Sequence, residues 1–206
     1  MKLVLATKNK DKVREISDFL APHGYEVMSI DEFPDIEEIE ENGETFRENA
    51  VYKATRACEL TGAMSLADDS GLEVDYLDGA PGIYSARFAG EEKDYHANNE
   101  KLLSLLAGVP VERRAAQFKC VMAVAVPDGW VYIAEGACDG VIAEEPRGEG
   151  GFGYDPLFYL PKYGQTFAQL DPEIKNEISH RARALAGVLD ILSDLKIMED
   201  DDEDEE

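Results

Sequence analysis

The fold is decided by the first stretch of the chain, where residues 3–20 read LVLATKNKDKVREISDFL. The apolar run at residues 3–6 predicts a short buried strand, and the polar cluster after it predicts a turn. Apolar residues from Val13 to Leu20 then recur at helical spacing, and Pro22 marks the end of that helix. The chain therefore opens as strand, turn and helix, which is the beginning of an α/β fold.

The next segments repeat this alternation. Residues 25–30 and 64–67 predict two further strands. Between them, Thr45 and Glu48 have the spacing of a capping box, and the apolar stripe that follows ends at Gly62. A second helix is therefore expected between the second and third strands.

The second half of the chain predicts a hairpin and a last helix. Residues 115–126 and 130–137 are strand-like and are joined by a Pro-Asp-Gly turn. Residues 77–90 are rich in glycine and proline and predict a loop, whereas residues 181–195 predict a helix. We interpret the order as an α/β fold with a long mixed β-sheet flanked by helices.

No linker separates two independent domains, so we expect one domain over residues 1–197. The last eight residues, 199–206, are all acidic. Such a run has nothing to bury, and residues 198–206 are therefore expected to form a disordered acidic tail.

The chain has 206 residues, with 20 Lys+Arg against 44 Asp+Glu and a net charge of −24. This charge repels phosphate polymers and anionic lipids, so we expect no nucleic acid partner and no membrane partner. No apolar run reaches the length of a membrane helix. The three cysteines have no metal-type spacing and are expected to be buried thiols in a reducing cytoplasm.

Basic residues gather where the first strand meets the first helix. Lys8, Lys10, Lys12 and Arg14 lie within seven positions. Backbone N–H groups at a helix start, aided by lysine, can bind an anion. The alternative is a solvated helix start that carries lysine for solubility.

Two adjacent carboxylates follow the third predicted strand. Asp68 and Asp69 at a strand end could hold a hard cation or activate water, and Gly71 would allow a sharp turn beside a ligand. In so acidic a chain, an ordinary acidic turn is the alternative.

Two later segments combine groups suited to a nucleotide base. Residues 149–156 contain glycines, two aromatic rings and a carboxylate, and could form either a base-binding wall or a turn anchored in the core. Ser179 is a plausible helix cap, which places His180 and Arg181 in the first turn, where cations oppose the helix dipole. A position that breaks this local rule is a candidate functional position.

Six segments in this order resemble the inosine triphosphate pyrophosphatase family, also called dITP/XTP pyrophosphatases. The matching segments are 7–12 (TKNKDK), 40–53, 67–72 (ADDSGL), 79–87 (GAPGIYSAR), 150–156 (GGFGYDP) and Lys175 with 179–181 (SHR). The resemblance implies a two-lobed fold with a central substrate cleft, and usually a homodimer. It also implies a Mg²⁺-dependent enzyme that hydrolyses inosine and xanthosine triphosphates, ribo and deoxy, to the monophosphate and pyrophosphate, which cleanses the nucleotide pool.

The resemblance also implies roles for individual residues. Glu40 and Asp69 are implied Mg²⁺ ligands, and Asp69 is also the implied base that activates water. The implied substrate-binding residues are Thr7, Lys8, Asn9, Lys10, Asp11, Lys12, Lys53, Ser70, Phe152, Gly153, Tyr154, Asp155, Lys175, His180 and Arg181. Among them, the last three are implied to read the 6-oxo group of the purine and its surroundings.

Two other functions remain open at this point. The septum-associated nucleotide pyrophosphatases have a similar fold and act on modified pyrimidines, although their usual Ser/Thr-x-Ser-x-x-Arg opening differs from residues 7–12. A nucleotide-binding sensor that has lost catalysis is the non-enzymatic alternative, and Lys12, Glu40 and Asp69 argue against it.

Overall fold

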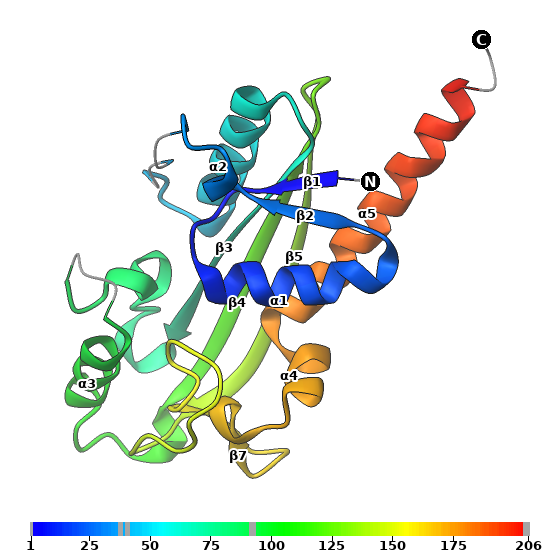
Figure 1. Cartoon of the computed structure of the whole chain (residues 1–206). Helices are drawn as coiled ribbons and strands as arrows, with labels where there is room; N and C mark the ends of the chain where they lie inside the picture. The colour runs from blue at the N-terminus through cyan, green and yellow to red at the C-terminus, as the bar shows by residue number, and fades with distance from the viewer. Residues whose placement is uncertain (1, 37–38, 40–41, 91–93, 204–206) are drawn as a thin grey trace. The chain divides into compact units, whose positions relative to one another are not determined.

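The structure is a computed structural model that describes residues 2–36, 39, 42–90 and 94–203, with side chains described as far as residue 197. Its seven strands form one mixed sheet in the order β2-β1-β3-β4-β5-β6-β7, and helices accompany the strands along the chain (Figure 1). This confirms the predicted α/β fold. The chain divides into two compact units. Unit 1 comprises residues 1–69, 121–135 and 182–206, and unit 2 comprises residues 70–120 and 136–181.

Unit 1 begins with the predicted strand–turn–helix. Its elements are β1 (Lys2–Leu5), α1 (Lys10–Leu20), β2 (Glu26–Ser29) and α2 (Phe46–Thr61), with parts of β3 (Ser65–Val74), β4 (Ala115–Ala125), β5 (Val131–Ile142) and α5 (His180–Glu203). Strand β1 pairs in parallel with both β2 and β3. Parallel strands are typically buried on both faces, which explains why residues 3–6 are apolar without alternation and are all buried.

The capped helix α2 forms as predicted, with one difference in its cap. The Thr45 hydroxyl accepts a hydrogen bond from the Glu48 backbone N–H at 3.1 Å, and Gly62 ends the helix in the left-handed conformation. The Glu48 carboxylate accepts from the backbone N–H of Glu44, at 2.7 Å, and not from that of Thr45. The start of α2 is therefore stabilised by the side chains of Thr45 and Glu48, which each accept a hydrogen bond from a backbone N–H group.

Unit 2 holds the rest of the sheet and a large apolar core. Its further elements are α3 (Tyr95–Leu105), β6 (Phe158–Leu160), β7 (Gln165–Thr166) and α4 (Pro172–Ile178). Strand β6 pairs antiparallel with β5 and with β7, which makes the sheet mixed. The core packs side chains of β3, α3, β4 and β5 with Phe158 and Phe167. Within the expected loop at residues 77–90, the structure has a 3₁₀ helix, Gly82–Arg87.

The acidic segment at residues 68–71 lies inside β3, so the predicted turn at a strand end is wrong. Asp68 and Asp69 are buried and have cationic partners, which lets charged side chains remain within a strand. Gly71 is not among the glycines with a positive φ, and it makes no sharp turn.

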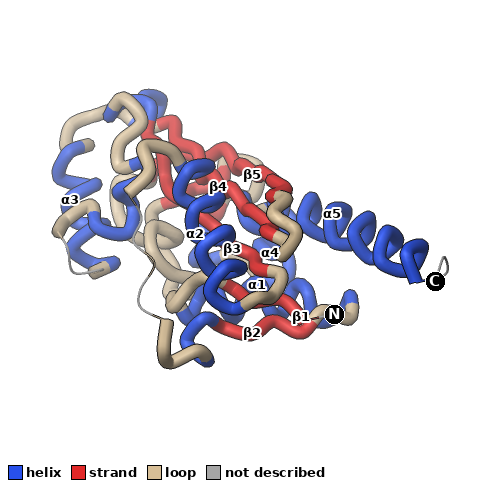
Figure 2. The backbone as a smooth tube through the Cα atoms, turned by 90° about the horizontal axis from the view of Figure 1, so that it is seen from above, coloured by secondary structure: helices blue, strands red, loops and turns tan. Residues whose placement is uncertain are grey.

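The last helix is longer than predicted. Helix α5 runs to Glu203, whereas the sequence pattern indicated an end near Leu195. No glycine or proline follows Gly187 to stop it, so the helix continues past Leu192, the last buried residue among the side chains described as far as residue 197. Figures 1 and 2 both show this end of α5 extending beyond the other elements of unit 1. Among the described residues, no helix is long and apolar enough to cross a membrane.

Candidate functional site

Five polar residues of unit 1 lie close together. We call them the Lys–Asp cluster: Lys12, Asn49, Lys53, Asp68 and Asp69. The Lys12 ammonium lies 2.9 Å from Asp68 Oδ2. Lys53 Nζ donates to the Asp68 carbonyl oxygen at 2.5 Å and lies 3.8 Å from Asp69 Oδ1. Asn49 Nδ2 donates to Asp69 Oδ2 at 3.0 Å. Two lysines and two carboxylates in one largely buried group can bind phosphate oxygens and exchange a proton with water.

The family resemblance gives no role to two members of this cluster, Asn49 and Asp68, although Asp68 is one of the two adjacent carboxylates that the sequence pattern marks as candidates. Asn49 and Lys53 are four residues apart on α2 and both are buried, on a face that is otherwise apolar. Two polar residues at i and i+4 on an apolar stripe are the sequence signal that identifies the pair. Asn49 also accepts from the Gly43 backbone N–H at 2.8 Å, so it links the segment before α2 to Asp69.

The polar residues between β1 and the first turn of α1 have different surroundings. Asn9 caps α1, because its Oδ1 accepts from the backbone N–H groups of Asp11 and Lys12 at 3.0 and 3.3 Å. The Thr7 hydroxyl accepts from the Asn9 N–H at 3.2 Å. Lys8 and Asp11 form exposed ion pairs, with Asp31 at 3.9 Å and with Arg14 at 3.1 Å, and Lys10 is exposed. Of the four basic residues in this turn, Lys12 is the one that reaches the Lys–Asp cluster.

The carboxylates of this cluster have the oxygen chemistry of a magnesium site. The described residues contain no group of three His, Cys, Asp or Glu that could hold a metal. Mg²⁺ commonly binds one or two protein carboxylates and completes its shell with water and substrate phosphates, so Asp68 and Asp69 fit this ion. Glu40, the other predicted ligand, lies outside the described residues.

In unit 2, a second group surrounds Phe152. The Asp155 Oδ2 atom accepts from Lys175 Nζ at 2.7 Å and from the Phe152 backbone N–H at 2.9 Å. Lys175 Nζ lies 5.2 Å from the centre of the Phe152 ring, and the Arg181 guanidinium lies 5.5 Å from it. We call Phe152, Asp155, Lys175 and Arg181 the aromatic–cation group. It holds two cations beside one aromatic ring, which suits an electron-rich carbonyl-bearing base.

The remaining predicted residues of unit 2 are buried or half-buried. His180 is buried and stacks on Phe118, with 4.6 Å between ring centres. The Tyr154 hydroxyl donates to the Ser85 carbonyl oxygen at 2.9 Å, and burial raises the pKa of Tyr154 above its usual range. Ser70 is half-buried in β3.

The loop before Asp155 depends on glycine. Gly151 and Gly153 have φ values of 69° and 62°, a region that other residues rarely adopt. A Cβ atom on Gly151 would lie 2.0 Å from Asp155 Oδ2, the atom that binds Lys175. Glycine at position 151 is therefore a requirement of the Lys175–Asp155 pair.

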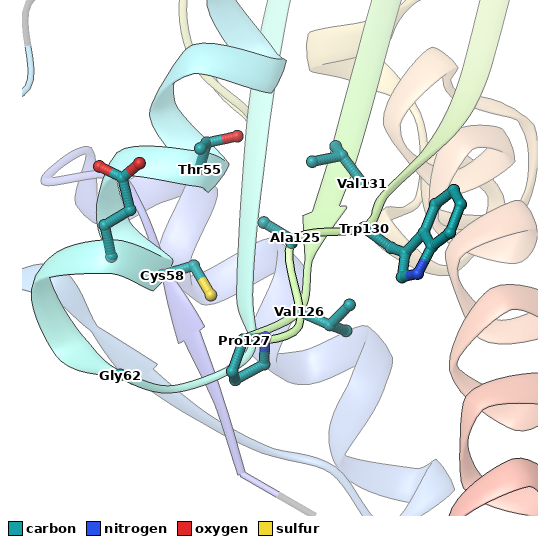
Figure 3. Close-up of a pocket in the computed structure, with 10 residues that line it drawn as sticks. Thr55, Cys58, Gly62, Ala125, Val126, Pro127, Trp130 and Val131 are labelled. Carbon is teal, nitrogen blue, oxygen red and sulfur yellow. The ribbon is translucent and has the colours of Figure 1, made fainter.

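A pocket of about 250 Å³ also lies in unit 1, between α2 and the turn that joins β4 to β5 (Figure 3). Cys58 directs its sulfur toward the turn at Pro127, and Trp130 stands at the turn with 68% of its surface exposed. Burial, then the charges of Glu59 and Asp128, raise the pKa of the Cys58 thiol. None of the predicted site residues lines this pocket.

The chain is similar to known proteins over nearly its full length. A model described as the Ham1 family matches residues 3–191. A Desulforamulus reducens protein named dITP/XTP pyrophosphatase is 62% identical over 96% of this chain and 98% of its own length. A Geobacillus kaustophilus protein of the same name is 55% identical over 89% of this chain and 90% of its own. The solved HAM1 protein of Coxiella burnetii has a TM-score of 0.85 at 40% identity, covering 94% of this chain and 99% of its own.

Proposed function

The chain belongs to the Ham1 family, and we propose on that premise that it is a nucleoside triphosphate pyrophosphatase. It hydrolyses deaminated purine nucleotides, ITP, dITP, XTP and dXTP, to the monophosphate and pyrophosphate, which removes them from the nucleotide pool. The observation that carries this proposal is the Lys–Asp cluster, in a chain matched over nearly its full length by relatives named for this activity.

The triphosphate is assigned to unit 1. Lys12 and Lys53 supply positive charge, and the Thr7 hydroxyl, which accepts from Asn9, keeps its own O–H to donate to a phosphate oxygen. Asn9 contributes by holding the first turn of α1 in place. Lys8, Lys10 and Asp11 belong to the same segment, and we assign them to the outer part of the substrate-binding site.

Asp69 acts as the base. A water molecule attacks the α-phosphorus, a new P–O bond forms, and the bond to the pyrophosphate oxygen breaks. Asp69 takes the proton of that water on its carboxylate, which Asn49 orients by a hydrogen bond to Oδ2. Lys53, 3.8 Å from Oδ1, favours the charged carboxylate before the transfer.

Mg²⁺ is the proposed cofactor, and Asp69 and Glu40 are its proposed ligands, with Asp68 as the neighbour of Asp69 in β3. When bound, the ion neutralises phosphate charge that builds up during attack. The two lysines of the Lys–Asp cluster act in the same direction, since each is held close to a carboxylate and can turn toward phosphate oxygens.

The base is assigned to the aromatic–cation group, with Gly153, Tyr154 and His180 shaping its surroundings and Ser70 contacting the substrate. Inosine and xanthosine present an oxygen acceptor at carbon 6, where adenine presents an amino donor. Donors on Lys175 and Arg181 match that oxygen and leave adenine poorly satisfied. Sites built on such hydrogen bonds discriminate by about 10⁴-fold or more.

A substrate panel tests the proposal. The protein is incubated with Mg²⁺ and purine or pyrimidine triphosphates, and the products are separated by chromatography. We expect monophosphate and pyrophosphate, formed fastest from ITP and XTP. Diphosphate and phosphate would refute the reaction type. Faster turnover of modified pyrimidines would favour the septum-associated class, and tight binding without product would favour a sensor.

We further propose a cytoplasmic homodimer without nucleic acid or membrane partners. The three cysteines are buried as thiols, which suits a reducing compartment. The net charge of −24 disfavours polymers of phosphate. Sedimentation analysis measures the oligomeric state, and a monomer at micromolar concentration would contradict the dimer.

A further inference from the structure

Helix α3 carries two adjacent asparagines that bind different segments of unit 2. Asn98 is buried, and its Nδ2 donates to the Ala86 carbonyl oxygen at 3.1 Å. Its Oδ1 accepts from the Ala89 N–H at 2.6 Å. Both ends of the Asn98 amide are therefore used, and it joins α3 to the segment that follows the 3₁₀ helix Gly82–Arg87.

Asn99 uses only one end of its amide. Asn99 Nδ2 donates to the Gly153 carbonyl oxygen at 2.9 Å. Asn99 Oδ1 is buried and has no hydrogen-bond partner within the described part of the chain. The orientation of the amide follows from chemistry, because a carbonyl oxygen only accepts and so must face the NH₂ group.

This arrangement is unfavourable for stability alone. One neutral hydrogen bond contributes less than a buried, unsatisfied acceptor costs. A leucine at position 99 would have a similar shape, a higher helix propensity and no such cost. Asn99 therefore serves a purpose other than stability, and Gly153, its hydrogen-bond partner among the described residues, indicates that purpose.

Gly153 needs an external support. Its φ of 62° and its lack of a side chain leave the orientation of the following peptide group poorly determined by the glycine itself. Asn99 fixes the carbonyl of that peptide group. One turn earlier on α3, the Tyr95 ring lies 6.1 Å from the Phe152 ring. Helix α3 therefore contacts two successive residues of the loop that is assigned to the base.

We propose that Asn99 is a positioning residue that sets base selectivity by fixing the Gly153 carbonyl and, with it, the Phe152 ring. This inference rests on the proposed function, in which Phe152 and Gly153 border the purine. Asn99 acts through the loop and is not assigned to the reacting atoms.

Two variants test the proposal. Asn99→Leu removes both polar atoms, and Asn99→Asp keeps the acceptor while it removes the donor. We expect KM for ITP to rise about tenfold in both, the factor that corresponds to one hydrogen bond, with kcat within about threefold of wild type. The preference for ITP over ATP should fall by a similar factor. The melting temperature of Asn99→Leu should equal or exceed that of the wild type.

Gln117→Leu is the matched control, because Gln117 is another amide of unit 2 whose Nε2 donates to Asp139 at 2.6 Å. Its kinetics should match the wild type. Unchanged KM and selectivity in both Asn99 variants would overturn the proposal. So would a rise in KM that appears only together with a large loss of melting temperature, since that result indicates a structural role. A wild-type protein without activity on ITP would refute the proposed function itself, and the inference with it.

Discussion

Replacing Asp155 by asparagine tests whether the aromatic–cation group is held by charge. Asparagine keeps the size of the side chain but removes the negative charge that faces Lys175. Asp155 and Lys175 are 3% and 8% exposed, and their charged atoms are 2.7 Å apart. The substitution therefore leaves an ammonium group buried without its carboxylate.

The size of the effect follows from this burial. Removing one partner of a buried ion pair costs about 3–5 kcal/mol. Lys175 keeps its contacts with the Phe152 and Phe167 rings, at 5.2 and 5.8 Å, which places the expected loss at the lower end of that range. A loss of about 3 kcal/mol lowers the melting temperature of a chain of this length by roughly 6–12 °C.

Thermal unfolding at neutral pH, followed by circular dichroism, measures this loss. Asp139→Asn is the control, because Asp139 is an exposed carboxylate of the same unit, bonded to the Gln117 amide. Its melting temperature should stay within about 2 °C of the wild type, since surface substitutions of this kind usually change stability by under about 0.5 kcal/mol. If Asp155→Asn also melts within about 2 °C of the wild type, the ion pair does not stabilise the loop and the reasoning is refuted.

Three further predictions concern catalysis, the core and pH. Asp69→Asn should lower kcat by about 10²–10⁴-fold while calorimetry finds the dissociation constant for ITP within a few-fold, and near-normal turnover would remove Asp69 from the role of base. Arg114→Met should lower the melting temperature by roughly 6–12 °C, because the buried guanidinium donates to three backbone carbonyl oxygens at 2.8–3.1 Å. The exposed neighbour Arg113, changed to Met, should have little effect. Tyr154 should stay protonated in the native protein at pH 11, so absorbance at 295 nm should report fewer than nine titrated tyrosines until urea unfolds the chain. Because the native pKa of Tyr154 lies above the unfolded value, the free energy of unfolding should fall as the pH rises past about 10.

The elements near the first stretch could be predicted because local rules and packing agree there. Apolar residues at positions 3–6 and the stripe from Val13 to Leu20 specify a strand and a helix without reference to distant residues. Thr45 and Gly62 likewise fix both ends of α2 by backbone hydrogen bonding and conformation alone. The order of the strands along the chain then leaves few α/β arrangements open.

Other features could not be predicted because their partners are remote in the sequence. A strand that contains Asp68 and Asp69 contradicts local preference, and it is stabilised by Lys12 and Lys53, which belong to two different helices. The burial of Asn49 depends on the same contacts. The end of α5 was predicted too early for a local reason. The apolar pattern ends near Leu195, but the sequence has no residue after it that stops the helix.

The contact at Gly151 restricts how this protein can vary. Every other amino acid has a Cβ atom, so each would place an atom 2.0 Å from the Asp155 oxygen that binds Lys175. In a library with all twenty residues at position 151, selection for the folded loop should therefore return glycine alone, whatever the size or polarity of the alternatives. A change at Asp155 to a shorter residue would relieve part of that crowding, but the φ of 69° at position 151 would still disfavour any residue other than glycine.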